Sequence, residues 1–220
     1  MSLPRKLAAE ALGTAFLLAA VIGSGIMGER LAEGNVALAL LANSIATGCA
    51  LTALILVFGP ISGAHFNPAV TLASASMKML TWSEAVAYIV VQIAAAFAGV
   101  AAAHLMFGEP LFFASVKERM GMAQWWSEIV ATFGLLLTIF GCLRSRPDAL
   151  PYAVGLFITA AYWFTASTSF ANPAVTLARA ASDTFAGIRP VDAPAFLLAQ
   201  LAGAFAVACL ARWLFPKPLR

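Results

Sequence analysis

The sequence predicts an all-α membrane protein in which six transmembrane helices and two re-entrant half-helices form an inverted repeat. The first observation behind this fold class is composition: 62% of the 220 residues are hydrophobic, only 10% are charged, and the mean hydropathy is +0.90. An ordinary soluble domain has about a quarter of its residues charged, so most side chains here must face lipid or other apolar helices. The other two observations are six long apolar stretches and a hexapeptide that occurs twice.

The six apolar stretches are each long enough to cross a membrane. A hydrocarbon core of roughly 30 Å needs about 20 helical residues. The first stretch follows Arg5 and Lys6, but it is longer than a signal-peptide core and has no convincing cleavage site, so we interpret it as a transmembrane helix. The expected transmembrane helices cover residues 7–27, 36–58, 84–107, 125–143, 150–169 and 194–215.

The repeated hexapeptide reads Asn-Pro-Ala-Val-Thr-Leu. It begins with Asn67-Pro68-Ala69 and again, 105 residues later, with Asn172-Pro173-Ala174. Asn is a favoured N-cap and Pro is favoured at the first helical position, so each copy predicts the start of a helix. Only about ten weakly apolar residues follow each copy, too few to cross the membrane. Each copy therefore predicts a half-helix that enters the membrane and returns, with its non-helical lead covered by protein.

The repeat extends beyond the hexapeptide. Glu10 and Glu128 lie near the starts of the first and fourth apolar stretches, and Gln92 and Gln200 lie in the third and sixth. Each half thus has three transmembrane helices and one half-helix, and an odd number of crossings turns the second half upside down. We expect one domain over residues 1–220, with inverted repeats at about 7–107 and 125–215.

Basic residues indicate the orientation. Cytoplasmic loops of membrane proteins are enriched in Lys and Arg. With a cytoplasmic N-terminus, the inside would carry Arg5, Lys6, Lys78, Arg144, Arg146, Arg212, Lys217 and Arg220, and the outside Arg30, Lys117, Arg119, Arg179 and Arg189. This distribution favours both termini in the cytoplasm. The net charge of +3 is small and scattered, so we do not expect nucleic acid as a partner.

Two half-helices that meet near the midplane would create a path for neutral solutes. Each N-terminus carries roughly half a positive charge, and the Asn amides can donate hydrogen bonds toward the path. A neutral hydroxylated molecule could exchange its hydrogen bonds to water for these donors. A proton or metal cation would meet a positive potential and little compensation for its lost hydration.

The chain resembles the aquaporin and aquaglyceroporin family over essentially its whole length. The resemblance is carried by Ser62-Gly-Ala-His-Phe-Asn-Pro-Ala-Val-Thr71, by Asn172-Pro173-Ala174, and by the Glu10/Glu128 and Gln92/Gln200 pairs. It implies a right-handed helical bundle, a pore in each subunit, a homotetramer in the lipid bilayer, and no cofactor. The segment Ser182-Asp-Thr-Phe-Ala-Gly187 is similar to that of bacterial aquaglyceroporins that lack the usual filter Arg and are associated with arsenic resistance.

The resemblance also implies where the narrow filter lies. The family builds it from four positions set by spacing from the two motifs, and here they are Thr47, Ala160, Ser169 and Val175. Val175 replaces an Arg and Thr47 replaces an aromatic residue. An Arg supplies a positive charge and five donors, whereas Val supplies neither. We therefore expect a wide, weakly polar filter that passes glycerol-like polyols, metalloid hydroxides such as arsenous acid, and some water, with organoarsenicals as further candidates.

Four other polar residues are candidates for the pore. Arg179 stands four residues after Val175 and shares its helical face. It could place a positive charge in the outer vestibule; alternatively, it extends to lipid headgroups or pairs with Asp183. His65 is expected to line or brace the cytoplasmic vestibule. Glu10 and Glu128 are expected to accept backbone N–H bonds from the loops that lead into the half-helices.

Three other functions compete with a channel for small neutral solutes. A water-selective channel would have the same fold, but Thr47 and Val175 argue against a narrow filter. An ion-coupled secondary transporter would also use inverted repeats, with Glu10 or Glu128 changing charge. A structural membrane protein or closed pore is the third, because Phe66 and Phe170 are bulky residues beside the motifs.

Catalysis and metal binding are not expected. The sequence has no nucleotide-binding loop and no nucleophile–base pair, and the His, Cys and acidic residues show no metal-ligand spacing. Cys49, Cys142 and Cys209 are expected to be small buried residues. The expected location is the plasma membrane of a bacterium.

Overall fold

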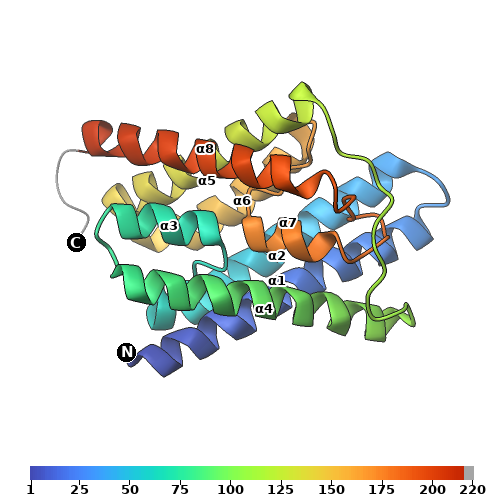
Figure 1. Ribbon diagram of the computed structural model, residues 1–220, viewed down its shortest axis with the longest axis horizontal. Coiled ribbons are helices and arrows are strands. Elements are labelled where there is room, and N and C mark those ends of the chain that lie inside the picture. Colours follow the sequence, from blue (N-terminus) through green and yellow to red (C-terminus); the bar gives the residue numbers. More distant parts are fainter. Residues whose placement is uncertain (216–220) are drawn as a thin grey trace.

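The computed structural model describes residues 1–215 of the chain. These residues fold into eight α-helices and one short 3-10 helix (Figure 1). The helices are α1 (Leu3–Leu31), α2 (Val36–Ser62), α3 (Pro68–Ser76), α4 (Trp82–Phe107), α5 (Met122–Ser145), η1 (Pro147–Ala149), α6 (Leu150–Phe164), α7 (Pro173–Arg179) and α8 (Ala193–Leu214).

Five of these helices are long and apolar enough to cross a membrane, namely α1, α2, α4, α5 and α8. The expected helix over 150–169 is too long, because α6 ends at Phe164 and has 15 residues, or about 22 Å at 1.5 Å per residue. After Phe164 the backbone is extended at Thr165 and has positive φ angles at Thr168 and Ser169. Residues 165–171 are apolar or small enough to resemble a helix end in the sequence, but they form the non-helical segment that leads into α7, called its lead below.

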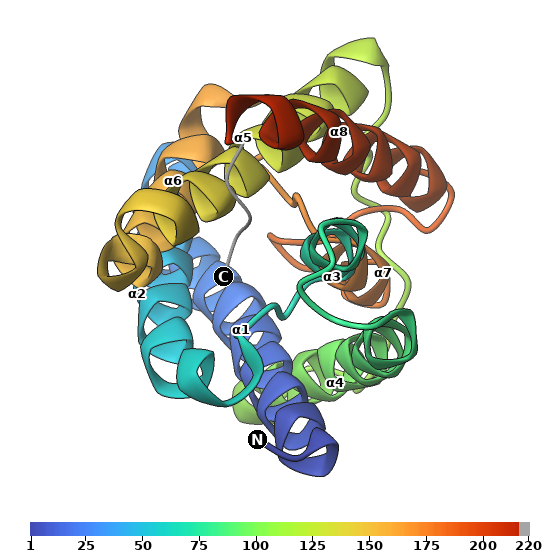
Figure 2. The ribbon, with the colours of Figure 1, turned by 90° about the vertical axis from the view of Figure 1, so that its left-hand side faces the viewer.

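The two halves of the chain have equivalent packing. In the first half α1 packs against α2 and α4, and in the second half α5 packs against α6 and α8. The half-helices α3 and α7 each pack against both α4 and α8. Figure 2 shows the six longer helices arranged in a ring, with α3 and α7 inside it between α4 and α8. Each half-helix is therefore enclosed by helices of both repeats.

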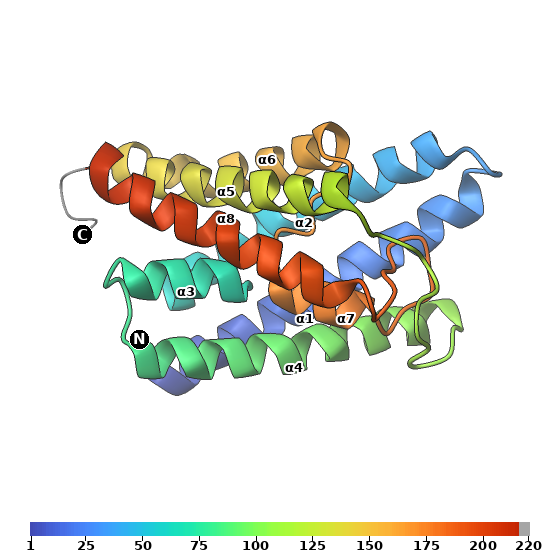
Figure 3. The same ribbon diagram turned by 45° about the horizontal axis from the view of Figure 1, so that its top comes forward.

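The half-helices approach from opposite ends of the bundle and meet end to end, as Figures 1 and 3 show. The N-terminus of the chain and the end of α8 lie at the same end of the bundle (Figure 1). Lys6 and Arg212 belong to that end, where Lys6 pairs with Glu84 at 3.0 Å and Arg212 donates to the carbonyl of Ser76. Lys217 and Arg220, which the charge argument places on the same side, lie outside the described residues.

The halves also contact each other where α2 crosses α6. Gly48 and Gly155 face each other at this crossing. A Cβ on Gly48 would lie 2.7 Å from the carbonyl oxygen of Gly155, and a Cβ on Gly155 would lie 2.6 Å from that of Gly48. Two missing side chains thus allow the two backbones to come into direct contact.

The expectation for the cysteines is wrong at two positions. Cys49 and Cys209 are exposed and Cys142 is half-buried. An apolar stretch in a membrane helix does not distinguish an interior face from a lipid face, because both are apolar.

Candidate solute pathway between the two half-helices

Asn67 and Asn172 cap the two half-helices in the same way. Their φ angles are −156° and −157°, and each is followed by a Pro at the start of the helix. The side-chain oxygen of Asn67 accepts from the backbone N–H of Ala69 at 2.8 Å, and that of Asn172 accepts from Ala174 at 3.0 Å. These bonds satisfy amide donors that would otherwise be unpaired at a helix start.

The amide groups of the two caps join the two halves. The Nδ2 of Asn67 donates to the carbonyl of Ala171 at 2.7 Å, and the Nδ2 of Asn172 donates to the carbonyl of Phe66 at 2.8 Å. Each Asn therefore bonds to the residue that precedes the other Asn. This reciprocal pair fixes the two half-helix N-termini against each other in the interior.

Glu10 holds the lead into α3. Its carboxylate accepts from the Ser62 hydroxyl at 2.6 Å, from the backbone N–H groups of His65 and Phe66 at 3.0 and 2.7 Å, and from the Gln92 amide at 2.8 Å. The backbone that it holds has positive φ at Ala64 and Phe66. Non-glycine residues avoid this conformation, and the buried carboxylate stabilises it with charge-assisted hydrogen bonds.

Glu128 does the same for α7. It accepts from the backbone N–H groups of Phe170 and Ala171 at 2.9 Å each, and from the Gln200 amide at 2.6 Å. Glu10 and Glu128 are both fully buried. The contacts match the expected bonding to the two leads, and the four Glu and Gln side chains occupy equivalent places in the two repeats.

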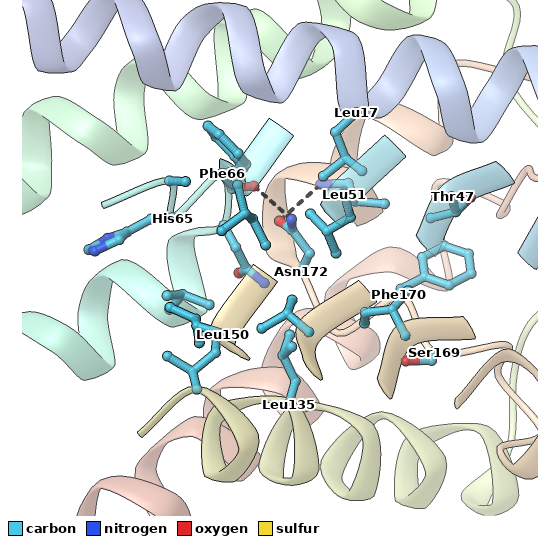
Figure 4. A pocket seen from close by; sticks show the side chains of 18 of the residues that line it. Leu17, Thr47, Leu51, His65, Phe66, Leu135, Leu150, Ser169, Phe170 and Asn172 are labelled. Carbon is cyan, nitrogen blue, oxygen red and sulfur yellow. Dashed lines mark hydrogen bonds between the residues drawn. The ribbon is translucent and has the colours of Figure 1, made fainter. Parts of the chain in front are cut away.

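A cavity of about 150 Å³ runs past the point where the half-helices meet. Figure 4 shows Asn172 near its middle, His65 on one side, and Thr47 and Ser169 on the other. Most of its lining is aliphatic. The apolar walls are formed by aliphatic side chains, among them Leu17, Val21, Leu51, Ile55, Val70, Leu135, Ile139, Leu143, Leu150, Val154 and Ile158. The polar atoms are thus gathered at the meeting point and toward the two ends.

Three of the four expected filter residues line this cavity, namely Thr47, Ser169 and Val175. Ala160 does not: it is exposed on the outside of α6. Tyr162 lines the cavity in its place, and its hydroxyl donates to the Thr47 hydroxyl at 3.3 Å. The count back from Asn172 was wrong because it passes through seven non-helical residues, 165–171, before it reaches α6. Spacing alone therefore does not fix the helical face.

Arg179 also lines the cavity, and it is 1% exposed. Its Nε donates to the carbonyl of Ala186, and its guanidinium carbon lies 3.3 Å from the centre of the Phe170 ring. The alternative pairing with Asp183 is absent, because Asp183 accepts instead from Ser115 and from the backbone N–H of Val116. Arg179 therefore points into the protein and not to lipid headgroups.

A second buried guanidinium lies near the same ring, and sequence reasoning did not single it out. Arg119 lies 4.8 Å from the Phe170 ring centre and donates to the carbonyls of Gly187 and Ser167 at 2.8 and 3.1 Å. Burial lowers the pKa of Arg119 to about 10. Unlike Arg179, Arg119 does not line the cavity.

Two connecting segments, one before α5 and one after α7, bond to each other at the end of the bundle where α7 ends. Phe113 and Ser115 donate their backbone N–H groups to Ala181 and Ala180 at 3.1 Å, and Arg189 donates its own to Lys117 at 2.8 Å. Burial, followed by the charges of Arg119 and Arg179, lowers the pKa of Lys117 to about 8. The segments 113–119 and 180–189 thus form a rim of mixed charge, in which Arg189 is paired with Glu118 at 3.1 Å.

His65 lies at the opposite end of the cavity. It is half-buried, its Nδ1 lies 3.1 Å from the Thr71 hydroxyl, and its ring packs edge-on against Tyr88 with centres 5.5 Å apart. The ring is therefore braced on two sides while it lines the cavity. His65 thus lines the cavity and has bracing contacts, and its place in a cytoplasmic vestibule stays a prediction.

Comparison with known proteins places this geometry in context. Residues 1–150 match the Major intrinsic protein family. The chain is 56% identical over 218 residues to Aquaglyceroporin AqpS of Rhizobium meliloti, covering 99% of this chain and 93% of that protein. It is 29% identical to Aquaporin Z of Bradyrhizobium diazoefficiens, over 97% of this chain and 95% of that protein.

A solved structure has the same fold. The X-ray structure of the aquaglyceroporin from Plasmodium falciparum matches with a TM-score of 0.76 and covers 98% of both chains. The sequence identity to it is 23%, so this match concerns the fold alone.

Proposed function

Because the chain belongs to the major intrinsic protein family, whose members are membrane channels and not enzymes, we propose that it passively conducts small neutral solutes. The proposed solutes are glycerol-like polyols and metalloid hydroxides such as arsenous acid, with some water, and organoarsenicals are larger candidates of the same class. The observation that carries this proposal is Val175, which lines the cavity where a water-selective filter would have Arg.

The cavity lining supports solutes that have both carbon and hydroxyl groups. Aliphatic walls favour the carbon backbone of a polyol, because apolar surface leaves water there. The Asn67 and Asn172 amides and the Thr47, Tyr162 and Ser169 hydroxyls offer partners for its oxygens. A pore that had only polar walls would favour water over a polyol.

Stopped-flow light scattering on proteoliposomes tests this proposal. Wild type should show fast glycerol and water flux, and Val175→Arg should cut glycerol flux about tenfold or more while water flux remains. Val175→Met is the matched control, because it adds length without charge or donors. Arsenous acid uptake is measured alongside, and fast water flux with negligible flux of both solutes in wild type would contradict the proposal.

A water-selective channel is the second candidate, and Tyr162 is the observation that favours it. An aromatic side chain beside Thr47 narrows the filter relative to the small residue expected there. The same light-scattering experiment separates the two functions, because Tyr162→Ala should then admit glycerol that the wild type excludes.

An ion-coupled transporter is disfavoured by the contacts of the buried acids. Every carboxylate oxygen of Glu10 and Glu128 accepts at least one hydrogen bond, and backbone N–H groups are among the donors. A coupled cycle in which one of these carboxylates changed charge would have to rearrange its bonds to the backbone before each half-helix in every turnover. Flux that stays linear with the solute gradient and does not respond to an imposed proton gradient would support a channel.

We further propose a bacterial plasma-membrane location, cytoplasmic termini and a homotetramer. The grouping of basic residues supports the orientation. The cavity passes between the two half-helices of one chain, so each subunit would conduct independently. Chemical cross-linking in membranes should then give a ladder that ends at four subunits.

A further inference from the structure

We propose that Arg179 supplies the positive charge of the outer filter in place of residue 175, and that it forms a binding subsite for solute oxygens with Ser169. This inference rests on the proposed channel function and adds a specific residue that excludes cations. In this view the charge of the filter is relocated by one helical turn instead of being lost.

The position of Arg179 carries the first step. It ends α7, four residues after Val175, and both side chains line the same cavity. Arg179 is 1% exposed, so its charge lies beside the pathway that it lines and is shielded from bulk water. Val175 contributes only aliphatic surface, which leaves room beside it for a solute.

The contacts of Arg179 carry the second step. Its Nε donates a hydrogen bond to the carbonyl of Ala186, and its guanidinium carbon lies 3.3 Å from the centre of the Phe170 ring. These two contacts fix the plane of the guanidinium. Among the described residues, the two terminal nitrogens of Arg179 have no hydrogen-bond acceptor, so they are available as donors to a solute.

Ser169 provides an independent observation. Its hydroxyl is buried at 2% exposure, lines the cavity, and has no hydrogen-bond partner within the described part of the chain. A buried hydroxyl without a partner is costly, and a passing solute hydroxyl would satisfy it. Arg179 only donates, whereas Ser169 can donate or accept, so the pair suits a neutral hydroxyl group.

Charge balance carries the last step. No carboxylate oxygen of residues 1–215 lies within 4.0 Å of the Arg179 or Arg119 guanidinium. The carboxylate of Glu128 is already engaged by two backbone N–H groups and by Gln200. The positive charge of Arg179 is therefore not neutralised by an ion pair, and it repels cations in a pathway of low dielectric.

The test compares cation entry with glycerol entry in proteoliposomes. Arg179→Gln should raise the uptake of methylammonium at pH 6, where this probe is charged, by about tenfold or more, with water flux as the check of folding. Arg179→Lys should keep cations out. Arg119→Gln is the matched control, because it removes a buried guanidinium near Phe170 that does not line the cavity, and it should not admit cations.

The swap Val175→Arg with Arg179→Gln should restore cation exclusion and lower glycerol flux. Ser169→Ala should lower glycerol flux about threefold relative to water. If Arg179→Gln does not fold, Ser169→Asp serves instead, because its carboxylate would neutralise Arg179 and should admit methylammonium. If Arg179→Gln, or Ser169→Asp in its place, still excludes methylammonium, the inference is overturned, while glycerol flux still supports the channel. If wild type conducts no glycerol, the channel function is rejected. Methylammonium entry measured against water flux would then still decide the role of Arg179.

Discussion

Glu10 and Glu128 show how single buried charges can determine the backbone of a pathway. Each carboxylate gathers the N–H groups of a non-helical lead and one Gln amide from a neighbouring helix. The leads have positive φ at non-glycine residues, which costs of order 1–3 kcal/mol per residue. The carboxylates offset that cost, so the two acids have a structural reason to be buried.

Glu10→Gln should therefore destabilise the protein. The substitution replaces one acceptor oxygen by an NH₂ group that faces donors, and leaving buried donors unpaired costs about 1–3 kcal/mol each. We expect a clear fall in the melting temperature in detergent and a matching loss of glycerol flux. Glu29→Gln, at an exposed position on the same helix, is the control and should leave both unchanged; equal melting temperatures for wild type and Glu10→Gln would refute this role.

At the scale of elements, the contact between α2 and α6 depends on two glycines. The space that a side chain would fill at Gly48 is taken by Thr159 and the Gly155 carbonyl, and the space at Gly155 is taken by Thr52 and the Gly48 carbonyl. The small residues thus let the two helices pack closely. The contact joins the two repeats on the side of the bundle away from α4 and α8. Thr47, next to Gly48, is thereby held at the cavity together with Tyr162 of α6.

Gly48→Ala should separate α2 from α6. The added Cβ would lie 2.7 Å from the Gly155 carbonyl oxygen, so a backbone must shift. We expect a melting temperature lower by several degrees and altered glycerol flux, measured by thermal denaturation in detergent and by light scattering. Gly59→Ala on the same helix has its nearest neighbour at 3.9 Å and should be neutral or stabilising by up to about 1 kcal/mol; the same response from both variants would exclude a packing effect.

At the scale of the whole molecule, the orientation can be measured directly. In variants without Cys49, Cys142 and Cys209, a new cysteine at Lys78 should be labelled by a membrane-impermeant maleimide only in opened cells. A cysteine at Glu118 should be labelled in intact cells. Both positions are exposed. Lys78 lies in the link before α4 and Glu118 in the segment after it, so they adjoin opposite ends of this helix. Each position is therefore the control for the other, and the reverse pattern would place the termini outside.

The sequence predicts the bundle and the meeting of the half-helices because both depend on local and repeated signals. Asn67 and Asn172 carry their own capping chemistry, and the pairs Glu10/Glu128 and Gln92/Gln200 mark equivalent places. The family and the all-helical fold are confirmed by the comparisons. Each of these predictions depends on a spacing that remains within one helix or recurs in both halves.

The end of the cavity near Ser169 and Arg179 was predicted less well, because it depends on tertiary contacts between segments distant in sequence. Ala160 was wrong because the non-helical lead before Asn172 hides the point where α6 ends. Once the end of α6 is known, Tyr162 is the residue of this helix that lines the cavity beside Thr47. Arg119 was not singled out because nothing local distinguishes a loop Arg that extends into lipid headgroups from one that is buried against Phe170.

The rim formed by segments 113–119 and 180–189 has a consequence for the direction of transport. Its backbone hydrogen bonds join the two loops to each other and to the end of α7, so we expect these loops to stay in place while a solute passes. In the proposed passive channel, the net flow of a neutral solute reverses with its concentration difference. The same molecule would then serve as an inlet when a nutrient is scarce inside the cell and as an outlet when a toxic solute accumulates there.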